Sequence, residues 1–403
     1  FMKLFIPQKS TSLIVIVAGC VLLLVSFGIR HSSGLYLIPI SNQLGSGREI
    51  FGLAIAIQFL MIGFGSPIFG AIADKYGSGK AALYSVILFL IGLYLFSLVN
   101  SSVMLIFSQA IFGLGCAGCG TAVVLGAVGK AVSEKHRTLS LGIVMAAGSL
   151  GQFLIVPLTG AMIEATDWQR SIVYLCFIAL IMLLFSLALS LPSKNSGGEG
   201  NQDRLLKSVL VEAFGNRSYI LLTVGFFVCG FHVSFVATHL PAYLEDISLP
   251  VWIGSWSLAL IGLFNVVGTI MFGYLGDSKS KKNLLVILYS LRSFLFLVFI
   301  FIPKTEITIL IFAALLGVLW LSTVPLTSGI ISVIFGSRYM SMLYGFTFLS
   351  HQIGSFTGSW FGGRFYDLYG SYDVMWWICV GLGFASAAMH FPIYEKPLVK
   401  KYT

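Results

Sequence analysis

Long runs of apolar residues, separated by short polar segments, make up most of the chain. An α-helix needs about 20 such residues to cross the hydrocarbon core of a bilayer. The pattern predicts twelve spans, at approximately residues 11–40, 50–74, 79–99, 102–130, 137–164, 168–191, 218–244, 251–276, 281–302, 306–334, 338–366 and 371–392. The sequence therefore indicates an all-α membrane protein.

The polar segment 192–217 divides the twelve runs into two sets of six. Its first part, PSKNSGGEGNQDR, has the composition of a flexible linker. The part that follows, LLKSVLVEAF, has the pattern of a short amphipathic helix on the membrane surface. We therefore expect a six-helix bundle over residues 1–191, a cytoplasmic linker over 192–217 and a second six-helix bundle over 218–403.

Composition and charge agree with this interpretation. Hydrophobic residues make up 57% of the chain and charged residues only 10%, whereas a soluble domain carries about 25% charged residues. The net charge of +9 does not indicate nucleic-acid binding, because Lys and Arg collect at the cytoplasmic face of membrane proteins. The loops on one side hold only Arg48, Arg170, Lys304 and Arg364, which predicts that both termini are cytoplasmic.

The sequence carries no pattern typical of catalysis or of a cofactor. We find no nucleophile–base pair, phosphate-binding loop or cluster with metal-ligand spacing. Cys116 and Cys119 form a CxxC pair, but their neighbours are Gly and Ala, which favours helix packing over zinc or redox chemistry. We therefore expect no enzyme activity, no cofactor and no metal.

A short motif occurs twice, at equivalent places in the two halves. Residues 70–80 (GAIADKYGSGK) join the second and third spans, and residues 273–282 (GYLGDSKSKK) join the eighth and ninth. Repeated halves are typical of carriers that work by alternating access. The first copy resembles the signature of the major facilitator superfamily, G-x-x-x-D-[RK]-x-G-x-[RK]-[RK].

That resemblance implies a fold and roles for several positions. Helices 1, 4, 7 and 10 would line a central cavity, helices 2, 5, 8 and 11 would join the two halves, and the remaining four would support them. The signature glycine would permit close helix packing and its aspartate would form a conformation-dependent charge latch. The latch residues in this chain would be Gly70, Asp74, Lys75 and Asp277.

A finer resemblance concerns residues 148–170, a glycine-rich helix with a proline near its end and then Asp-Trp-Gln-Arg. This segment, together with 28–40 and 230–244, is similar to bacterial members of the monocarboxylate porter and oxalate/formate antiporter branch. Two departures stand out. Asn265 and Thr269 occupy the places of the acid and arginine that the branch carries on helix 8, and Gln109 lies near the place of the fourth-helix arginine of other facilitators.

Two arginines fall inside predicted spans, while all fifteen acids fall at predicted helix ends or in loops. A charged side chain at mid-membrane costs a few kcal/mol or more. An arginine without an acidic partner there attracts an anion, and its planar fork can hold a carboxylate with two parallel hydrogen bonds. We expect Arg30 on helix 1 to contact the substrate. Arg292 on helix 9 either contacts the substrate or bonds main-chain carbonyls.

Polar side chains on the cavity and junction helices supply the remaining candidates. His351 lies on a polar stripe with Tyr344, and His232 and His239 share one face of helix 7. The two helix-7 histidines lie about 10 Å apart along the helix axis, which is too far for one metal ion. We expect His351 and His232 to contact substrate or carry a proton, and His239 to lie at a gate. The remaining predicted substrate-binding residues are Tyr344, Gln152, Asn265 and Trp320; interhelical hydrogen bonds are the alternative for each.

These observations predict a secondary transporter for a small organic anion, of mono- or dicarboxylate type. We favour proton symport, because a histidine can lose its charge when a cationic cavity is empty. An anion exchanger and an exporter of amphipathic compounds are the alternatives, and the short loops argue against a sensor. We expect a monomer in the bacterial inner (plasma) membrane.

Overall fold

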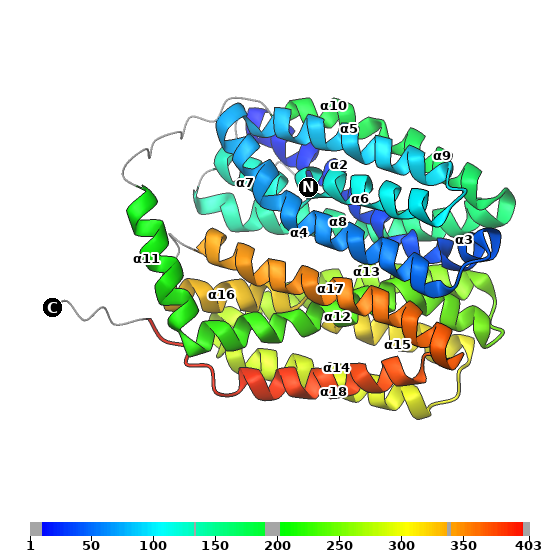
Figure 1. Ribbon diagram of the computed structural model, residues 1–403. Helices are drawn as coiled ribbons and strands as arrows, with labels where there is room; N and C mark the ends of the chain where they lie inside the picture. Colours follow the sequence, from blue (N-terminus) through cyan, green and yellow to red (C-terminus); the bar gives the residue numbers. More distant parts are fainter. Residues whose placement is uncertain (1–9, 133, 190–201, 337–339, 398–403) are drawn as a thin grey trace.

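The computed structural model describes residues 10–132, 134–189, 202–336 and 340–397. Nearly all of it is helical, and the axes of most helices lie roughly along one common line (Figure 1). In the amino-terminal half they are α2 (Ser10–His31), η1 (Ser33–Tyr36), α3 (Leu37–Leu44), α4 (Arg48–Tyr76), α5 (Ser78–Ser97), α6 (Ser102–Cys119), α7 (Thr121–Ala131), α8 (Glu134–Ala165), α9 (Trp168–Ala179) and α10 (Ile181–Ala188).

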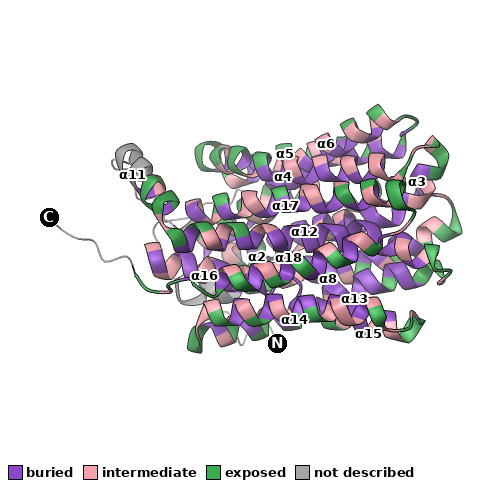
Figure 2. Cartoon of the chain, turned by 60° about the horizontal axis from the view of Figure 1, so that its bottom comes forward, coloured by how far each residue is buried: buried purple, intermediate pink, exposed green. Residues whose placement is uncertain are grey.

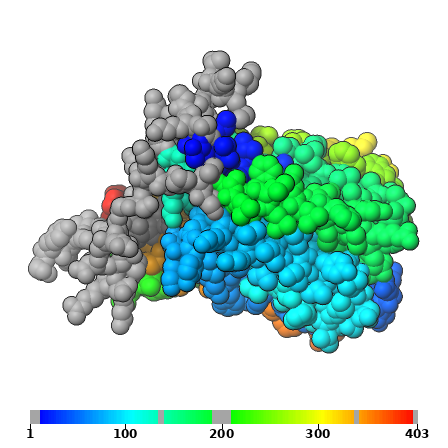
Figure 3. All heavy atoms as spheres, turned by 90° about the horizontal axis from the view of Figure 1, so that it is seen from above, coloured from blue at the N-terminus to red at the C-terminus, as the bar shows by residue number. Residues whose placement is uncertain are grey.

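The carboxy-terminal half repeats this arrangement. Its helices are α12 (Arg217–Asp246), α13 (Val251–Ser278), α14 (Lys281–Phe301), α15 (Glu306–Leu319), α16 (Thr323–Phe335), α17 (Met340–Tyr369) and α18 (Asp373–His390). The two halves lie side by side in Figure 1, each with its own hydrophobic core. Seen from above, the amino-terminal half forms most of the visible face (Figure 3).

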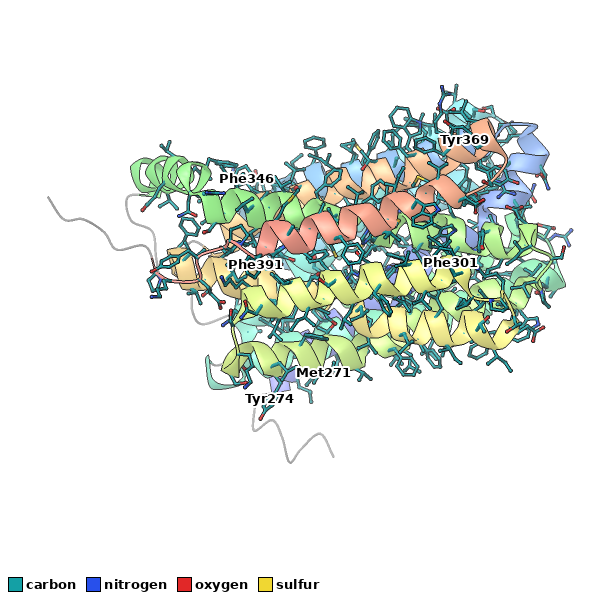
Figure 4. The ribbon with its side chains drawn as sticks, turned by 90° about the horizontal axis from the view of Figure 1, so that it is seen from below. Met271, Tyr274, Phe301, Phe346, Tyr369 and Phe391 are labelled. Carbon is teal, nitrogen blue, oxygen red and sulfur yellow. The ribbon has the colours of Figure 1, made fainter. Side chains whose placement is uncertain are left out.

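Among the described residues, ten segments are long and apolar enough to cross a membrane. In this count α2, η1 and α3 form one segment, and so do α6 with α7, α9 with α10, and α15 with α16. They correspond to the first ten predicted spans, and α17 and α18 run alongside them as the remaining two (Figure 1). Large apolar side chains project from the outside of the bundle, including Tyr274, Phe301 and Phe391, each more than 70% exposed (Figure 4). A bilayer would cover such a surface. The predicted all-α membrane fold is confirmed.

Four spans that the sequence predicts as single helices are broken among the described residues. The first passes through the 3₁₀ turn η1, and the fourth breaks between α6 and α7 at Gly120. The sixth breaks between α9 and α10 at Leu180, and the tenth breaks between α15 and α16. A break in a spanning helix is tolerated where neighbouring groups satisfy the freed backbone. At the tenth span, Asn265 Oδ1 accepts a hydrogen bond from the Leu321 amide at 2.9 Å.

The two halves join along two helix pairs, α4 with α17 and α8 with α13. These are the second, eleventh, fifth and eighth spans, as the family resemblance implies. Buried residues concentrate along these junctions and within each half (Figure 2). Helices α5 and α14 instead pack mainly inside their own halves, against α6 and α9–α10 and against α18.

The space around glycines on the junction helices shows how closely the two halves approach each other at each depth in the membrane. A Cβ at Gly63 would lie 3.1 Å from the Gln352 side chain, and one at Gly262 would lie 2.9 Å from Gln152. Nearer the predicted cytoplasmic end, the four helices carry Gly70, Gly142, Gly273 and Gly345, where an added Cβ would meet nothing within 4 Å. The halves therefore pack tightly from mid-depth to the predicted outer end and loosely beyond it.

The segment between the halves contains the predicted short helix. It is α11 (Gln202–Gly215), which lies at one end of the bundle in Figure 1. Val209 and Ala213 are buried, and the Phe214 ring meets the rings of Tyr219 and Phe346 edge-on. Residues 192–201 of the predicted linker lie outside the described residues.

Candidate functional site

Arg30 lies in the last turn of α2, at the point where the first span changes from α-helix to 3₁₀ helix. Two glycines set its position, because they let α2 approach α8 closely. A Cβ at Gly28 would lie 2.7 Å from the Gly151 carbonyl oxygen, and one at Gly151 would lie 2.6 Å from the Leu24 carbonyl carbon. Arg30 is thus fixed in the interior of the amino-terminal half, where the carbonyl end of a helix favours a cation.

The guanidinium of Arg30 has no hydrogen bond or ion pair with any described residue. It lies over the Phe27 ring, with Cζ 4.7 Å from the ring centroid. The titratable groups that interact with it electrostatically are the thiols of Cys116 and Cys119 and the imidazole of His31. None of these is a carboxylate, and Arg30 is only half-buried. Its five N–H donors therefore remain available to an anion.

Arg292 on α14 has entirely different surroundings. It is fully buried, and its Nη2 donates to the main-chain carbonyls of Leu319 and Trp320, the latter at 2.5 Å. These are carbonyls that the break in the tenth span frees. Nη1 donates to Cys229 Sγ at 3.6 Å. Arg292 thus makes the main-chain bonds that the sequence offered as the alternative to substrate contact.

His351 and Tyr344 lie on α17 within an aromatic cluster. The His351 ring stacks on Phe348 with a centroid distance of 5.8 Å and an interplanar angle of 9°, and it contacts Phe226 at 4.9 Å. Tyr344 stacks on Phe348 in turn and is half-buried. His351 Nδ1 lies 3.4 Å from Gln352 Oε1, while Nε2 has no hydrogen-bond partner in the described part of the chain. One ring nitrogen is therefore available for a proton or a ligand.

The two helix-7 histidines lie on α12 at different depths and are both fully buried. His232 Nε2 lies 2.9 Å from the Cys379 carbonyl, and its Nδ1 has no hydrogen-bond partner among the residues that the structure describes. His239 Nε2 lies 2.7 Å from the Ser359 carbonyl, and its Nδ1 is 3.2 Å from the Tyr372 hydroxyl. His31, beside Arg30, has Nδ1 2.8 Å from the Phe27 carbonyl.

Three further candidates lie at or near the junction of the halves. Gln152 Nε2 donates to the Leu258 carbonyl at 2.7 Å, and Asn265 Nδ2 donates to Ser149 Oγ at 3.0 Å. Both bonds join α8 to α13, so these amides make the interhelical hydrogen bonds that were the alternative reading. Trp320 is buried at the break in the tenth span, and its indole N–H has no partner.

The latch residues lie at the predicted cytoplasmic end. Lys130 Nζ donates to Asp74 Oδ1 at 2.7 Å, an ion pair within the amino-terminal half in which both side chains are more than half exposed. Lys75 lies over the Tyr76 ring, and Asp277 is exposed. Gly70 does not make the close helix packing that the resemblance implies, because the halves pack loosely at its depth.

A charged contact that the sequence does not predict joins the halves at the predicted outer end. Arg48 at the start of α4 donates from Nη1 and Nη2 to both carboxylate oxygens of Asp246, each at 2.6 Å. Arg48 Nη1 also donates to the Tyr372 hydroxyl at 3.0 Å, and burial raises the pKa of Tyr372. Among described residues, the ion pairs joining the halves are this one and Arg364 with Glu49. The sequence places Arg48 among only four cations in the predicted outer loops, but nothing in it indicates that Asp246 is its partner.

Asp367 strengthens the same junction without a cationic partner. Its two carboxylate oxygens accept hydrogen bonds from the main-chain amides of Arg48 and Glu49 at 2.9 and 2.8 Å. These amides open α4, and a carboxylate is favoured at a helix amino terminus. We call Arg48, Glu49, Asp246, Arg364, Asp367 and Tyr372 the outer junction.

Two halves of membrane-spanning helices that pack together most tightly toward one end form the architecture of a membrane transporter built from repeated halves. The family model of the Major Facilitator Superfamily matches residues 18–359. The chain belongs to this family.

Relatives and solved structures agree. The chain is 23% identical over 386 residues to the uncharacterized MFS-type transporter YcxA of Bacillus subtilis, covering 92% of this chain and 93% of the relative. It is 25% identical to the sialic acid transporter NanX of Escherichia coli, over 66% of this chain and 64% of that protein. Monocarboxylate transporter 13 of Rattus norvegicus is 21% identical, with coverage of 86% and 80%.

Among solved structures, a D-xylose-proton symporter superposes with a TM-score of 0.74, covering 96% of this chain and 99% of its own, at 13% identity. That likeness concerns the fold.

Proposed function

We propose that this protein is a proton-coupled secondary transporter that moves a small organic anion across the membrane by alternating access. The observation that carries the proposal is Arg30, a half-buried guanidinium with no acceptor among the described residues. An unpaired cation at this depth is costly. A carboxylate of the substrate would offset that cost with a bidentate, charge-assisted contact.

Two relatives support an anionic substrate. One is named a sialic acid transporter and the other a monocarboxylate transporter, and both names describe acids. The loose packing near Gly70 and Gly273 supports entry from the predicted cytoplasmic end in this conformation. The outer junction would then have to open for the opposite state, and the latch residues would exchange partners.

The proposed binding set has a cationic side and an aromatic side. Arg30 and Phe27 contribute the first, and Tyr344, Phe348 and His351 contribute the second. His351 fits the role of a proton acceptor because its Nε2 is unpartnered. His232 Nδ1 has no hydrogen-bond partner among the described residues, and the His232 ring packs 5.0 Å from the ring of Phe296 in the carboxy-terminal core. We leave Arg292 out of the set, because both of its Nη atoms already donate to groups in the core of the carboxy-terminal half.

Counterflow in proteoliposomes tests the proposal. Vesicles loaded with one unlabelled carboxylate should accumulate the labelled form transiently, and a panel of mono- and dicarboxylates identifies the preferred substrate. A pH gradient, acidic on the outside, should drive net uptake if protons move with the anion. Counterflow of neutral amphipathic compounds in place of carboxylates would instead support an exporter. If carboxylates show counterflow but a pH gradient does not increase their net uptake, the result would support an anion exchanger.

A further inference from the structure

The carboxy-terminal half contains a buried positive charge, distinct from Arg30, that no buried carboxylate balances among the described residues. Arg292 is the one formally charged side chain that is buried among the described residues, and no buried Asp or Glu accompanies it there. The carbonyls of Leu319 and Trp320 that accept its hydrogen bonds carry only partial charge. A buried ion is costly unless it is paired. A neighbouring group that can become negative would remove that cost.

Cys229 on α12 is placed to be that group. Its Sγ is fully buried, and it accepts from Arg292 Nη1 at 3.6 Å. The Thr323 hydroxyl, at the start of α16, lies 3.2 Å from the same sulfur. A thiolate can accept both bonds. A protonated thiol can instead donate to the Trp320 carbonyl, 3.9 Å away. The site can therefore satisfy both protonation states of Cys229.

A second titratable group connects this thiol with the aromatic cluster of α17. The Cys229 sulfur interacts electrostatically with the His351 imidazole, whose Nε2 has no hydrogen-bond partner among the described residues. His351 stacks on Phe348, which packs against the hydrophobic cores of both halves. Tyr344, half-buried on the same helix, also interacts electrostatically with the thiol. His351 thus lies between Cys229 and the junction of the halves.

The other helices packed around Cys229 contribute further titratable groups. Tyr289 on α14 has its ring 5.5 Å from the Arg292 Cζ, and its hydroxyl interacts with Cys229. The Tyr289 ring stacks on His390 of α18 at 4.9 Å. His232, one turn along α12, interacts electrostatically with Arg292. Cys379 on α18 also interacts electrostatically with Arg292, but among the described residues it makes no hydrogen bond with that side chain. This set contains neither a carboxylate nor a second formal cation, and Cys229 is the thiol that accepts a hydrogen bond from the arginine.

We propose that Cys229 binds and releases the proton that is coupled to transport, with Arg292 as its fixed counter-charge. The thiolate takes one proton from the protonated His351 imidazole, so an S–H bond forms as an N–H bond breaks, and the imidazole regains its proton from a hydronium ion of the aqueous phase. Release reverses the step, and no electrons are transferred. The inference rests on the proposed anion transport and names the residue that carries its coupling.

Comparing net uptake with counterflow tests the role of Cys229. In counterflow the substrate-bound transporter exchanges labelled for unlabelled substrate, which needs no net movement of protons. Uptake driven by a pH gradient needs net proton movement. Cys229→Ser keeps a small hydrogen-bonding group beside Arg292 that does not ionise. It should retain carboxylate counterflow and lose the extra accumulation driven by the gradient. Cys379→Ala, which removes another fully buried thiol of the same half, is the matched control and should behave as wild type. Gradient-driven accumulation that persists in Cys229→Ser overturns the proposal.

A spectroscopic measurement separates this proposal from the choice of substrate. An infrared difference spectrum between acidic and alkaline samples of the whole protein should contain an S–H stretching band. That band should be missing in Cys229→Ser and present in Cys379→Ala. A band unchanged in Cys229→Ser would contradict the proposal even if carboxylates are transported. Failure of carboxylate counterflow in the wild type, with the S–H band present, would remove the proposed substrate and leave the protonation site.

Discussion

Arg48 and Asp246 connect the two halves of the molecule through two parallel hydrogen bonds of 2.6 Å. The Arg48 side chain is only 12% exposed and that of Asp246 26%, so water screens the pair weakly. The Arg48 guanidinium also lies over the Tyr366 ring, with Cζ 3.7 Å from the centroid. One side chain of the amino-terminal half is therefore enclosed by α12, α17 and the start of α18.

We expect removal of this pair to favour opening at the predicted outer end. Arg48→Gln or Asp246→Asn should shift the balance between conformations by about 1–3 kcal/mol, the usual size of such coupling. A cysteine introduced by Ser359→Cys, buried at the junction, should then react faster with a membrane-impermeant thiol reagent added outside. The double variant should add little to either single change, because both remove the same contact.

Arg170→Gln is the control for this experiment. Arg170 is an exposed arginine that pairs with Asp167 inside the amino-terminal half. Its loss should leave the labelling rate unchanged. Equal labelling of Ser359→Cys in all backgrounds would show that the Arg48–Asp246 pair does not hold the outer end closed.

Arg30 should control the affinity for an anionic substrate. Arg30→Gln removes the charge, and a hydrogen bond to a charged group contributes about 1.5–3 kcal/mol. The half-saturation concentration in counterflow should rise by about 10- to 150-fold. Arg30→Lys keeps the charge without the fork and should give an intermediate value. A wild-type affinity in Arg30→Gln, with normal expression, would remove Arg30 from the site.

Arg292 should matter for stability as well as for transport. Arg292→Met keeps much of the volume but leaves the Leu319 and Trp320 carbonyls without their donor, at about 1–3 kcal/mol for each unsatisfied group. Eliminating the buried cation offsets part of this loss. We therefore expect a lower Tm in detergent, whereas Arg30→Gln should change the Tm little. An unchanged Tm in Arg292→Met would indicate that the break in the tenth span is stable without this arginine.

Asp74 should affect transport far more than stability. Its ion pair with Lys130 is exposed, and such pairs contribute about 0–1 kcal/mol. Asp74→Asn should leave the Tm nearly unchanged and lower the maximal transport rate, if the aspartate exchanges partners between conformations. Asp277→Asn, at the repeated position, has no ion pair among described residues and serves as the comparison. Equal rates for Asp74→Asn and the wild type would contradict a latch role.

Much of the fold follows from local pattern. Each apolar run is long enough to cross a bilayer, and a spanning segment must satisfy its own backbone hydrogen bonds, which leaves the helix as the available form. Asp74 and Asp277 mark the repeat in the sequence itself. Arg30 could also be chosen from the sequence as a candidate anion-binding residue, because it lies in an apolar run without a nearby acidic residue.

The surroundings of each polar side chain depended on the tertiary structure. Arg30 and Arg292 have the same chemistry and similar apolar flanks. Arg30 has no hydrogen-bond acceptor among the described residues, whereas both Nη atoms of Arg292 donate to buried acceptors. The difference arises from the break after Leu319, which frees main-chain carbonyls beside α14. These carbonyls lie 27 and 28 residues from Arg292 along the chain. Arg48 and Asp246 likewise meet across 198 residues.

Hydropathy and motif spacing therefore determined the spans, their division into two halves and the family, since each of these depends on residues close together in sequence. Which cation is open to an anion, which thiol faces an arginine and which end of the molecule is closed were decided by helix packing. Packing brings together groups from distant segments, and no local pattern records their distances.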